Sequence, residues 1–415
     1  MTWSVRRLPF VFVIAVVLPG AAAAQDRPAP PPAPVVSAGE NGVSIQSPNG
    51  DFQLRFGALV HADGRFAIAD DAARVTDSFV VRRLRPSLRG RLSRRFEFFI
   101  NPDFAAGVLV VQDAYLDTVF TPSFRVRFGK SKTPFGLERM QSAAYTLFYE
   151  RALPTALAPN RDIGVMALGD VAGGLLSYQG GLLNGVPDGG SSDLDTGDSK
   201  DVAGRIVVRP FIRRGAADPL RGLAVGFAAT AGKQAGAAAL PTLRTPSLQQ
   251  IIFSYTGASA DGTRTRYSPQ SSFVYKSFGG LAEYVRTEQP VASTSAIVDV
   301  AHQAWQVAGS LLITGEAATD GSTGVRPRAN FDFGSGHWGA VQIVARYQRL
   351  EVDEAARRFA AAGSALSAEG WTAGVNWYLT PNVRYLVNVE RTVFDDNNSA
   401  RPAENALVFR SQLYF

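Results

Sequence analysis

The chain is dominated by an alternation of apolar and other residues that repeats, over segments of roughly ten residues, from Asp51 to the C-terminus. The alternation is sharpest in residues 83–92, where leucines share one face of the predicted strand and arginines share the other: Leu84, Leu88 and Leu92 against Arg83, Arg85, Arg89 and Arg91. A strand that meets lipid on one side and water on the other requires this pattern. Its repetition predicts a membrane-spanning antiparallel β-barrel.

Two consecutive segments near the C-terminus indicate how the predicted strands connect. Every second residue of 371–379 and of 383–389 is apolar, and only a Thr-Pro-Asn tripeptide lies between the two segments. Such a tight connection is typical of the periplasmic turns of a membrane barrel, whereas longer polar stretches such as 188–198 suit the outside loops. If a strand and its share of the connections take about 20 to 25 residues, the region 51–415 forms an all-β, porin-like barrel of about 16 strands, within about 14 to 18.

The first residues of the chain form a predicted secretory signal peptide. Arg6 and Arg7 precede an apolar stretch that is shorter than the ~20 residues a transmembrane helix needs, and Ala21–Ala24 follow it. A transit peptide, the competing interpretation, would spread its arginines along an amphipathic segment. The sequence therefore predicts a signal peptide in residues 1–24 and export to the Gram-negative cell outer membrane.

Residues 25–50 are predicted to be a proline-rich periplasmic segment that precedes the barrel at 51–415. Their DRPAPPPAP stretch is expected to be extended and solvated. The segment is too short to form a globular plug, so the lumen is expected to be filled with water. The mature region has no run of 18 apolar residues, and the chain has no cysteine. Neither a transmembrane helix nor a disulfide framework is therefore expected.

The distribution of charge changes the picture more than the net charge of +6 does. Between Phe79 and Arg139 there are twelve basic residues and five acidic ones. Arginines spaced by two along a strand face one compartment, and a charge on the lipid face would cost ~2 to 4 kcal/mol at the bilayer midplane, so these arginines are expected to face the lumen. Guanidinium groups at successive sites replace part of the hydration of an anion. The alternative is that Glu97, Asp113 and Asp117 neutralise the arginines, which would then shape the field without selecting a solute.

Several motifs occur in a fixed order along the chain. They are RRLRPSLRG (82–90), DAYLD (113–117), FGKSKTPFGLER (128–139), NRDIGV (160–165), LLNG (182–185), TGE (314–316), WGAVQIVARYQRL (338–350), GVNWYLTPNVR (374–384) and the terminal FRSQLYF. Together they resemble the phosphate-selective porins O and P. This resemblance covers nearly the whole mature chain, and it implies a trimeric outer-membrane channel of 16 strands that passes phosphate or polyphosphate along an arginine ladder.

The resemblance also suggests which residues perform these roles. Arg82 and Arg83 match the arginine ladder, and a constriction loop after Phe128 would be lined by Lys130, Lys132 and Arg139. With the alternating arginines, the complete set of candidate anion-binding and pore-lining residues is Arg82, Arg83, Arg85, Arg89, Arg91, Arg125, Arg127, Lys130, Lys132 and Arg139. Beyond Lys132 only three lysines follow, so the lysine cluster of a strict phosphate channel is thinned, and other small anions stay open as substrates.

Other functional classes find little support in the sequence. The three histidines, His61, His302 and His337, lack the spacing of metal ligands and a hydrolase context. The acidic stretch 188–198 could bind calcium, but it lacks the glutamate spacing of an EF-hand and suits a solvated loop. No catalytic residue, metal, cofactor or nucleic-acid partner is predicted. The expected partners are small anions, outer-membrane lipid and two further copies in a homotrimer. A general small-solute porin is the main alternative, and a barrel enzyme or surface-interaction protein is a further one.

Overall fold

The computed structural model describes residues 33–68, 76–191, 193, 198–395 and 401–415. The predicted signal peptide lies outside these residues. Sixteen strands form the barrel: β3 (Gln53–Ala67), β4 (Ser78–Leu92), β5 (Phe96–Asp103), β6 (Val110–Thr121), β7 (Phe124–Lys132), β8 (Arg161–Val171), β9 (Leu176–Leu183), β10 (Asp201–Val208), β11 (Leu223–Gly236), β14 (Ser259–Tyr275), β15 (Phe278–Ala292), β16 (Ile297–Leu312), β17 (Ala340–Glu351), β18 (Ser367–Tyr378), β19 (Val383–Asp395) and β20 (Glu404–Tyr414).

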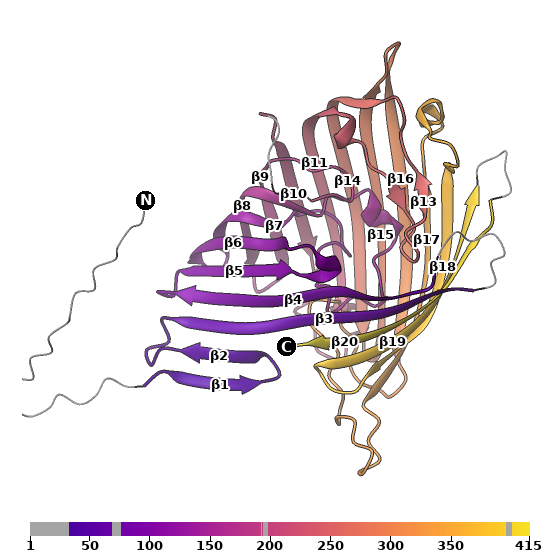
Figure 1. The fold of residues 1–415 in the computed structure, drawn as a ribbon. Coiled ribbons are helices and arrows are strands. Elements are labelled where there is room, and N and C mark those ends of the chain that lie inside the picture. Colours follow the sequence, from indigo (N-terminus) through magenta and orange to yellow (C-terminus); the bar gives the residue numbers. More distant parts are fainter. Residues whose placement is uncertain (1–32, 69–75, 192, 194–197, 396–400) are drawn as a thin grey trace, which may run out of the picture.

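Antiparallel pairing between sequential strands closes the sheet (Figure 1). Each barrel strand pairs with the next one along the chain, and β11 pairs with β14. The ring closes where β20 pairs with β3, from Tyr414 opposite Leu59 to Ala406 opposite Ala67. The predicted all-β, antiparallel barrel of about 16 strands is therefore confirmed.

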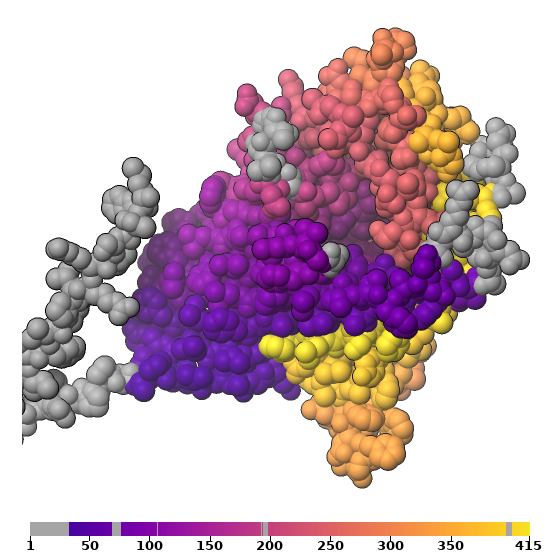
Figure 2. Space-filling view, in the orientation of Figure 1, coloured from indigo at the N-terminus to yellow at the C-terminus, as the bar shows by residue number. Residues whose placement is uncertain are grey.

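Two further strands extend the sheet beside β3. β1 (Val35–Gly39) and β2 (Gly42–Gln46) form a hairpin, and β2 pairs with the first four residues of β3. β20 pairs with the later part of β3, so β2 and β20 share one edge of that strand. Figure 2 shows this hairpin, in indigo, as a ledge beside the yellow end of β20.

The barrel surface follows the alternation in the sequence. The outward positions carry exposed apolar residues, with Trp371 58% exposed, while the neighbouring inward residue Thr372 is buried. The inward positions of β14–β20 are mostly polar and buried, among them Gln306, Gln342, Arg346, Gln348, Asn376, Arg384, Asn388, Glu390, Arg410 and Gln412. The apolar residues of the outer face suit contact with lipid, because the hydrocarbon core of a membrane offers no hydrogen-bond partners. The buried polar side chains of the inner face need hydrogen-bond partners, which segments inside the barrel provide.

The two ends of the barrel differ in their connections. One end, called the turn end here, carries the connections 93–95, 122–123, 172–175, 209–222, 276–277, 313–339 and 379–382. The opposite loop end carries, among the described residues, the connections 104–109, 133–160, 237–258, 293–296 and 352–366. Short 3₁₀ turns lie in or beside these connections: η1 (Ala105–Gly107), η2 (Leu153–Ala156), η3 (Pro219–Gly222), η4 (Ala237–Ala239) and η5 (Glu354–Phe359). No helix among the described residues is long and apolar enough to cross a membrane.

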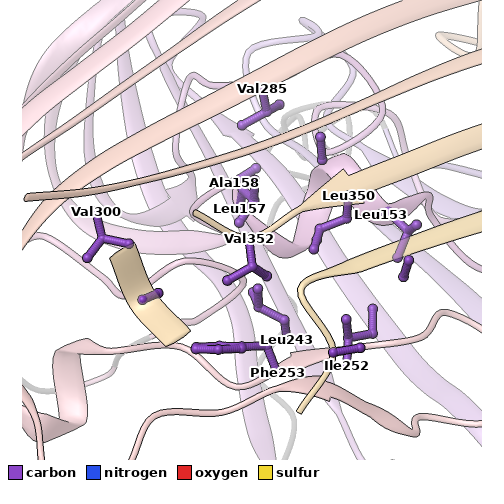
Figure 3. Close-up of a cluster of buried hydrophobic side chains, with 14 of the residues drawn as sticks. Leu153, Leu157, Ala158, Leu243, Ile252, Phe253, Val285, Val300, Leu350 and Val352 are labelled. Atoms are coloured by element: carbon purple, nitrogen blue, oxygen red, sulfur yellow. The ribbon is translucent and has the colours of Figure 1, made fainter. Parts of the chain in front are cut away.

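Two loop-end connections fold into the barrel and form an apolar core there. The inner loop, residues 133–160, packs against a hairpin formed by β12 (Leu243–Arg244) and β13 (Ile251–Phe253). Figure 3 shows Leu153 and Leu157 of the inner loop close to Leu243, Ile252 and Phe253 of the hairpin. Inward side chains of β11 and β15–β19 complete this core, so part of the lumen is filled by protein.

Candidate functional site: the lumenal passage

Two cavities lie along the inner wall formed by β3–β11 and β14. The larger has a volume of about 510 Å³ and is bounded on its other side by the inner loop and by residues 320–322 of connection 313–339. The smaller, of about 210 Å³, is lined by β3–β7 and shares part of this wall. Inward positions of neighbouring strands supply the lining, which is why residues far apart in the sequence meet here.

The lining is strongly basic. Ten basic residues line the two cavities, namely Arg55, Arg85, Arg89, Arg91, Arg125, Arg127, Lys132, Arg161, Arg205 and Arg209. Four acidic residues accompany them, namely Glu97, Asp113, Asp117 and Asp320. Basic residues therefore exceed acidic ones by six along the passage.

Four of these arginines form ion pairs with nearby carboxylates. Arg85 Nε lies 2.7 Å from Asp103 Oδ2. The other pairs are Arg127 with Asp117 at 2.7 and 2.8 Å, Arg161 with Asp113 at 3.1 and 3.2 Å, and Arg125 with Glu97 at 3.9 Å. The alternative drawn from the sequence, in which acidic residues neutralise the arginines, thus applies to this part of the wall.

Three arginines of the larger cavity form no ion pair with any carboxylate of the described residues. Arg205 donates to Gln270 Oε1 at 2.9 Å, and Arg209 donates to Ser177 Oγ at 3.0 Å. Arg89 lies over an aromatic ring instead. Their positive charges are therefore not compensated locally and act on the solution inside the cavity.

The structure brings together six of the ten residues singled out from the sequence. Arg85, Arg89, Arg91, Arg125, Arg127 and Lys132 line the cavities. The amine of Lys132 donates to the carbonyl oxygens of Met140 and Gln141, at 3.0 and 2.7 Å, so it also supports the inner loop. The remaining four, Arg82, Arg83, Lys130 and Arg139, do not line either cavity.

Arg82 and Arg83 bind the inner loop. The register between β3 and β4 shifts after His61, which makes Arg82 the extra residue of a β-bulge. Consecutive residues of a regular strand face opposite sides, but the bulge lets both arginines face inward. Arg82 Nε and Arg83 Nη2 donate to the two carboxylate oxygens of Glu150, at 2.5 and 3.0 Å.

Glu150 is the centre of a larger charged cluster. Arg65 and Arg410 each place a guanidinium nitrogen 3.6 Å from Glu150 Oε1. Arg410 also grips Asp63 with two hydrogen bonds of 2.6 and 2.7 Å, and it donates to the carbonyl oxygen of Tyr149. These contacts fasten the inner loop to β3, β4 and β20.

Lys130 and Arg139 have other partners. Lys130 shares the outward face of β7 with the exposed Phe128, and it pairs with Asp193 of the connection between β9 and β10. Arg139 lies within the inner loop and donates to the carbonyl oxygen of Thr155. Neither side chain reaches the cavities, because Lys130 is buried in its ion pair with Asp193 and Arg139 is enclosed by the inner loop.

Hydrogen bonds across the barrel hold the inner loop against β15–β20. They join Glu283 to Leu137 and Glu138, Gln306 to Glu138, Gln348 to Leu153, Arg346 to Glu150, Asn376 to Leu147, Asn388 to Tyr149, Arg384 to Thr146 and Gln412 to Ala144. Buried polar side chains of that wall are thus paired with loop atoms. The two arginine-lined cavities lie on the opposite side of the loop, against β3–β11.

Sequence reasoning did not place Arg55, Arg161, Arg205 and Arg209 among the candidate site residues. The signal was present for two of them, because Arg205 and Arg209 alternate with the outward residues Ile206 and Val208. The candidate residues were all chosen from residues 79–139 because arginine is in local excess there, whereas the cavity wall also includes β8 and β10. Among the described residues, no group of three or more His, Cys, Asp and Glu could hold a metal ion.

Comparisons with known proteins agree with this architecture. The family model of the phosphate-selective porins O and P matches residues 52–415. No curated protein sequence matches the chain.

Among solved structures, the outer-membrane channel DcaP of Acinetobacter baumannii has a TM-score of 0.59 at 12% identity, with 89% of this chain and 99% of that chain covered. The anion-selective porin of Comamonas acidovorans has a TM-score of 0.55 at 9% identity, with 88% and 100% covered. The trimer form of OmpT, an outer-membrane protein of Vibrio cholerae, has a TM-score of 0.52 at 12% identity, with 88% and 99% covered. These structures share the fold. The chain therefore belongs to the phosphate-selective porin O and P family and forms an outer-membrane porin channel.

Proposed function

We propose that the channel is selective for anions and that phosphate and related oxyanions are its preferred solutes. The observation that supports this proposal is the set of three uncompensated arginines, Arg89, Arg205 and Arg209, around one cavity of about 510 Å³. They come from separate parts of the arginine-lined wall: Arg89 lies on β4, Arg205 on β10 and Arg209 directly after β10. An anion in the cavity therefore meets positive charge from more than one side.

Arginine suits this role for two physical reasons. Its planar guanidinium can give two parallel hydrogen bonds to phosphate or carboxylate, and it stays charged at every physiological pH. Successive sites that each replace only part of the hydration shell let an ion enter and also leave. The paired arginines Arg85, Arg127 and Arg161 extend the row of guanidinium groups, with their charge offset by aspartates.

The proposal extends to location and assembly. Residues 1–24 act as a signal peptide, residues 25–50 form a periplasmic segment, and residues 51–415 form the barrel, with the turn end facing the periplasm. Five of the seven turn-end connections are two to four residues long, and short turns on the periplasmic side are the rule for such barrels. Three copies form the assembly, an arrangement supported by the trimer form described for the Vibrio cholerae protein of the same fold.

Reversal potentials in planar bilayers test the anion preference. The purified protein is placed under a potassium chloride gradient, and the variant R89Q/R205Q/R209Q is compared with the charge-matched control R213Q/R214Q/R221Q. The control residues lie in the turn-end connection 209–222 and line neither cavity. We expect an anion-favouring potential in the wild type and the control, and a value close to zero in the lumenal variant. An unchanged potential in that variant would refute the role of these arginines.

Titration with phosphate tests the preferred solute. Phosphate that binds at the arginines reduces the chloride current, whereas a phosphate-free buffer of equal ionic strength does not. We expect the lumenal triple variant to need more phosphate for the same block. Ohmic conductance without ion preference, and indifferent to phosphate, would favour a general small-solute porin.

A further inference from the structure

Four residues of the wall form a stack of guanidinium groups and rings. Arg89 Cζ lies 4.1 Å from the centre of the Phe99 ring, and Arg127 Cζ lies 3.6 Å from the centre of the Tyr115 ring. The two rings are neighbours, with centres 5.8 Å apart. Strand pairing produces the arrangement, because Arg89 is opposite Phe99, which in turn is opposite Tyr115.

The stack lies at the junction of the two cavities. Arg89, Phe99, Tyr115 and Arg127 are the residues that line both the larger and the smaller cavity. A solute that moves between these cavities therefore passes this stack. Two aromatic rings at such a place are not needed to conduct a small inorganic ion, for which charge and water suffice.

The two arginines differ in their electrical role. Arg127 is neutralised by the bidentate contact with Asp117, so it offers a flat guanidinium surface with little net charge. Arg89 forms no ion pair with a described carboxylate and retains its full charge. In each case one face of the guanidinium covers a ring, which orients the group along the wall.

We propose that this stack is a binding subsite for anions that carry an aromatic ring, such as aryl phosphates and aromatic carboxylates. The proposal rests on the proposed anion selectivity and names a class of organic anion within it. The charged group of the solute accepts hydrogen bonds from Arg89, while its ring packs against Phe99, Tyr115 and the guanidinium of Arg127. Ring contacts of this kind strengthen binding by roughly two- to tenfold relative to a solute with the same charged group and no ring.

Paired probes isolate the contribution of the ring. Inorganic phosphate is compared with phenyl phosphate, and acetate with benzoate, as blockers of chloride current through single wild-type channels. We expect the half-blocking concentration of each aromatic anion to be about two- to tenfold lower than that of its partner. Equal half-blocking concentrations within both pairs would overturn the subsite.

Variants then locate the effect. F99L/Y115L removes both rings but keeps an apolar wall, and the single variant F99L covers the case in which the double variant does not fold. The control is F128L, because Phe128 lies on the outward face of the neighbouring strand β7. We expect the preference for aromatic anions to fall in the first two variants and to persist in F128L. A preference that persists in F99L/Y115L would assign it to another part of the channel and overturn the proposal.

The same experiments separate this inference from the proposed function. A wild-type channel without anion-favouring reversal potential contradicts anion selectivity itself. A channel that favours anions but does not distinguish phenyl phosphate from phosphate contradicts the aromatic subsite alone.

Discussion

Arg82 Nε donates to Glu150 Oε1 at 2.5 Å, and the two residues are 68 positions apart in the chain. The contact exists because a β-bulge turns Arg82 inward beside Arg83, which binds the other carboxylate oxygen. The inner loop, which bounds the larger cavity, is thus fastened to the wall by a carboxylate shared between consecutive arginines.

Replacement of Glu150 by Gln is expected to destabilise the folded barrel. The change keeps the shape of the side chain but leaves Arg83 and Arg410, both buried, without their shared negative charge. Removing one partner of a buried ion pair costs about 3 to 5 kcal/mol. Equilibrium unfolding by urea from lipid vesicles measures the loss, and current noise in single channels reports the released loop.

A double variant distinguishes loss of charge balance from loss of packing. In R83M/E150Q one unpaired cation is removed together with the carboxylate, so we expect part of the stability to return. A double-mutant cycle gives the coupling between the two residues. If R83M/E150Q is less stable than E150Q by the full effect of R83M, the two side chains are not coupled.

The contact between Glu150 and the arginines should also determine how the channel responds to acid. Burial acts to raise the pKa of Glu150, but Arg83, Arg82, Arg410 and Arg65 outweigh it and hold that pKa well below its usual value. A carboxyl whose pKa is lowered by folding stabilises the protein fully above its unfolded value of about 4.3 and loses this effect as the pH falls toward the folded value. Thermal stability should therefore stay level from about pH 8 to 5 and fall below about pH 4. E150Q should lack this part of the acid loss; an equal loss in both proteins would contradict the assignment.

Removal of the β12–β13 hairpin is expected to raise the unitary conductance. The hairpin lies inside the barrel against the inner loop, and Ser247 Oγ lies within hydrogen-bond distance of the carboxylates of Glu390 on β19 and Glu404 on β20. Replacement of residues 243–253 by two glycines removes this material from the lumen. The milder variant T245A/S247A keeps the hairpin and removes its side-chain hydrogen bonds to Glu390 and Glu404, so it should show transitions between a smaller and a larger conductance. An unchanged conductance in the deletion would mean that ions do not pass near the hairpin.

A charge placed on the outer surface of the barrel tests whether that surface contacts lipid. Val387 is 42% exposed on the outer surface of β19, between Val375 and Phe409 of the adjacent strands. Arginine at such a position costs about 2 to 4 kcal/mol near the bilayer midplane. We expect V387R to unfold at lower urea concentration in vesicles, whereas S295R in the exposed connection 293–296 should have little effect. Equal stability of V387R and the wild type would contradict a membrane-facing surface there.

The sequence predicts the barrel well because lipid imposes a simple rule on each strand. Leu84 lies on the exposed face of β4, while Arg83 and Arg85 are buried inside, as their alternation predicts. The bulge at Arg82 is not predictable in this way, since it depends on the register with β3. The partner of Arg83 is not predictable either, because Glu150 reaches it through the path of the inner loop.

The N-terminal hairpin was not predicted from the sequence, for a different reason. Residues 35–46 were assigned to a proline-rich periplasmic segment with no strands predicted in it, and they form β1 and β2. The signal was Gly42, which directly follows the two turn residues Glu40 and Asn41 and has a positive φ of +85°, the left-handed conformation that a hairpin built on a type I turn needs at the next residue. The proline-rich composition of the preceding residues concealed it.

The shared edge of β3 sets a limit on how the ring can close. β2 pairs with residues 53–56 of β3, and β20 pairs with residues 59–67 of the same edge. The final residue, Phe415, exchanges backbone hydrogen bonds with Ala58, next to the stretch that β2 occupies. A terminal strand lengthened by two residues would have to displace the hairpin. The first hairpin of the chain thus limits how far the last strand can extend along β3.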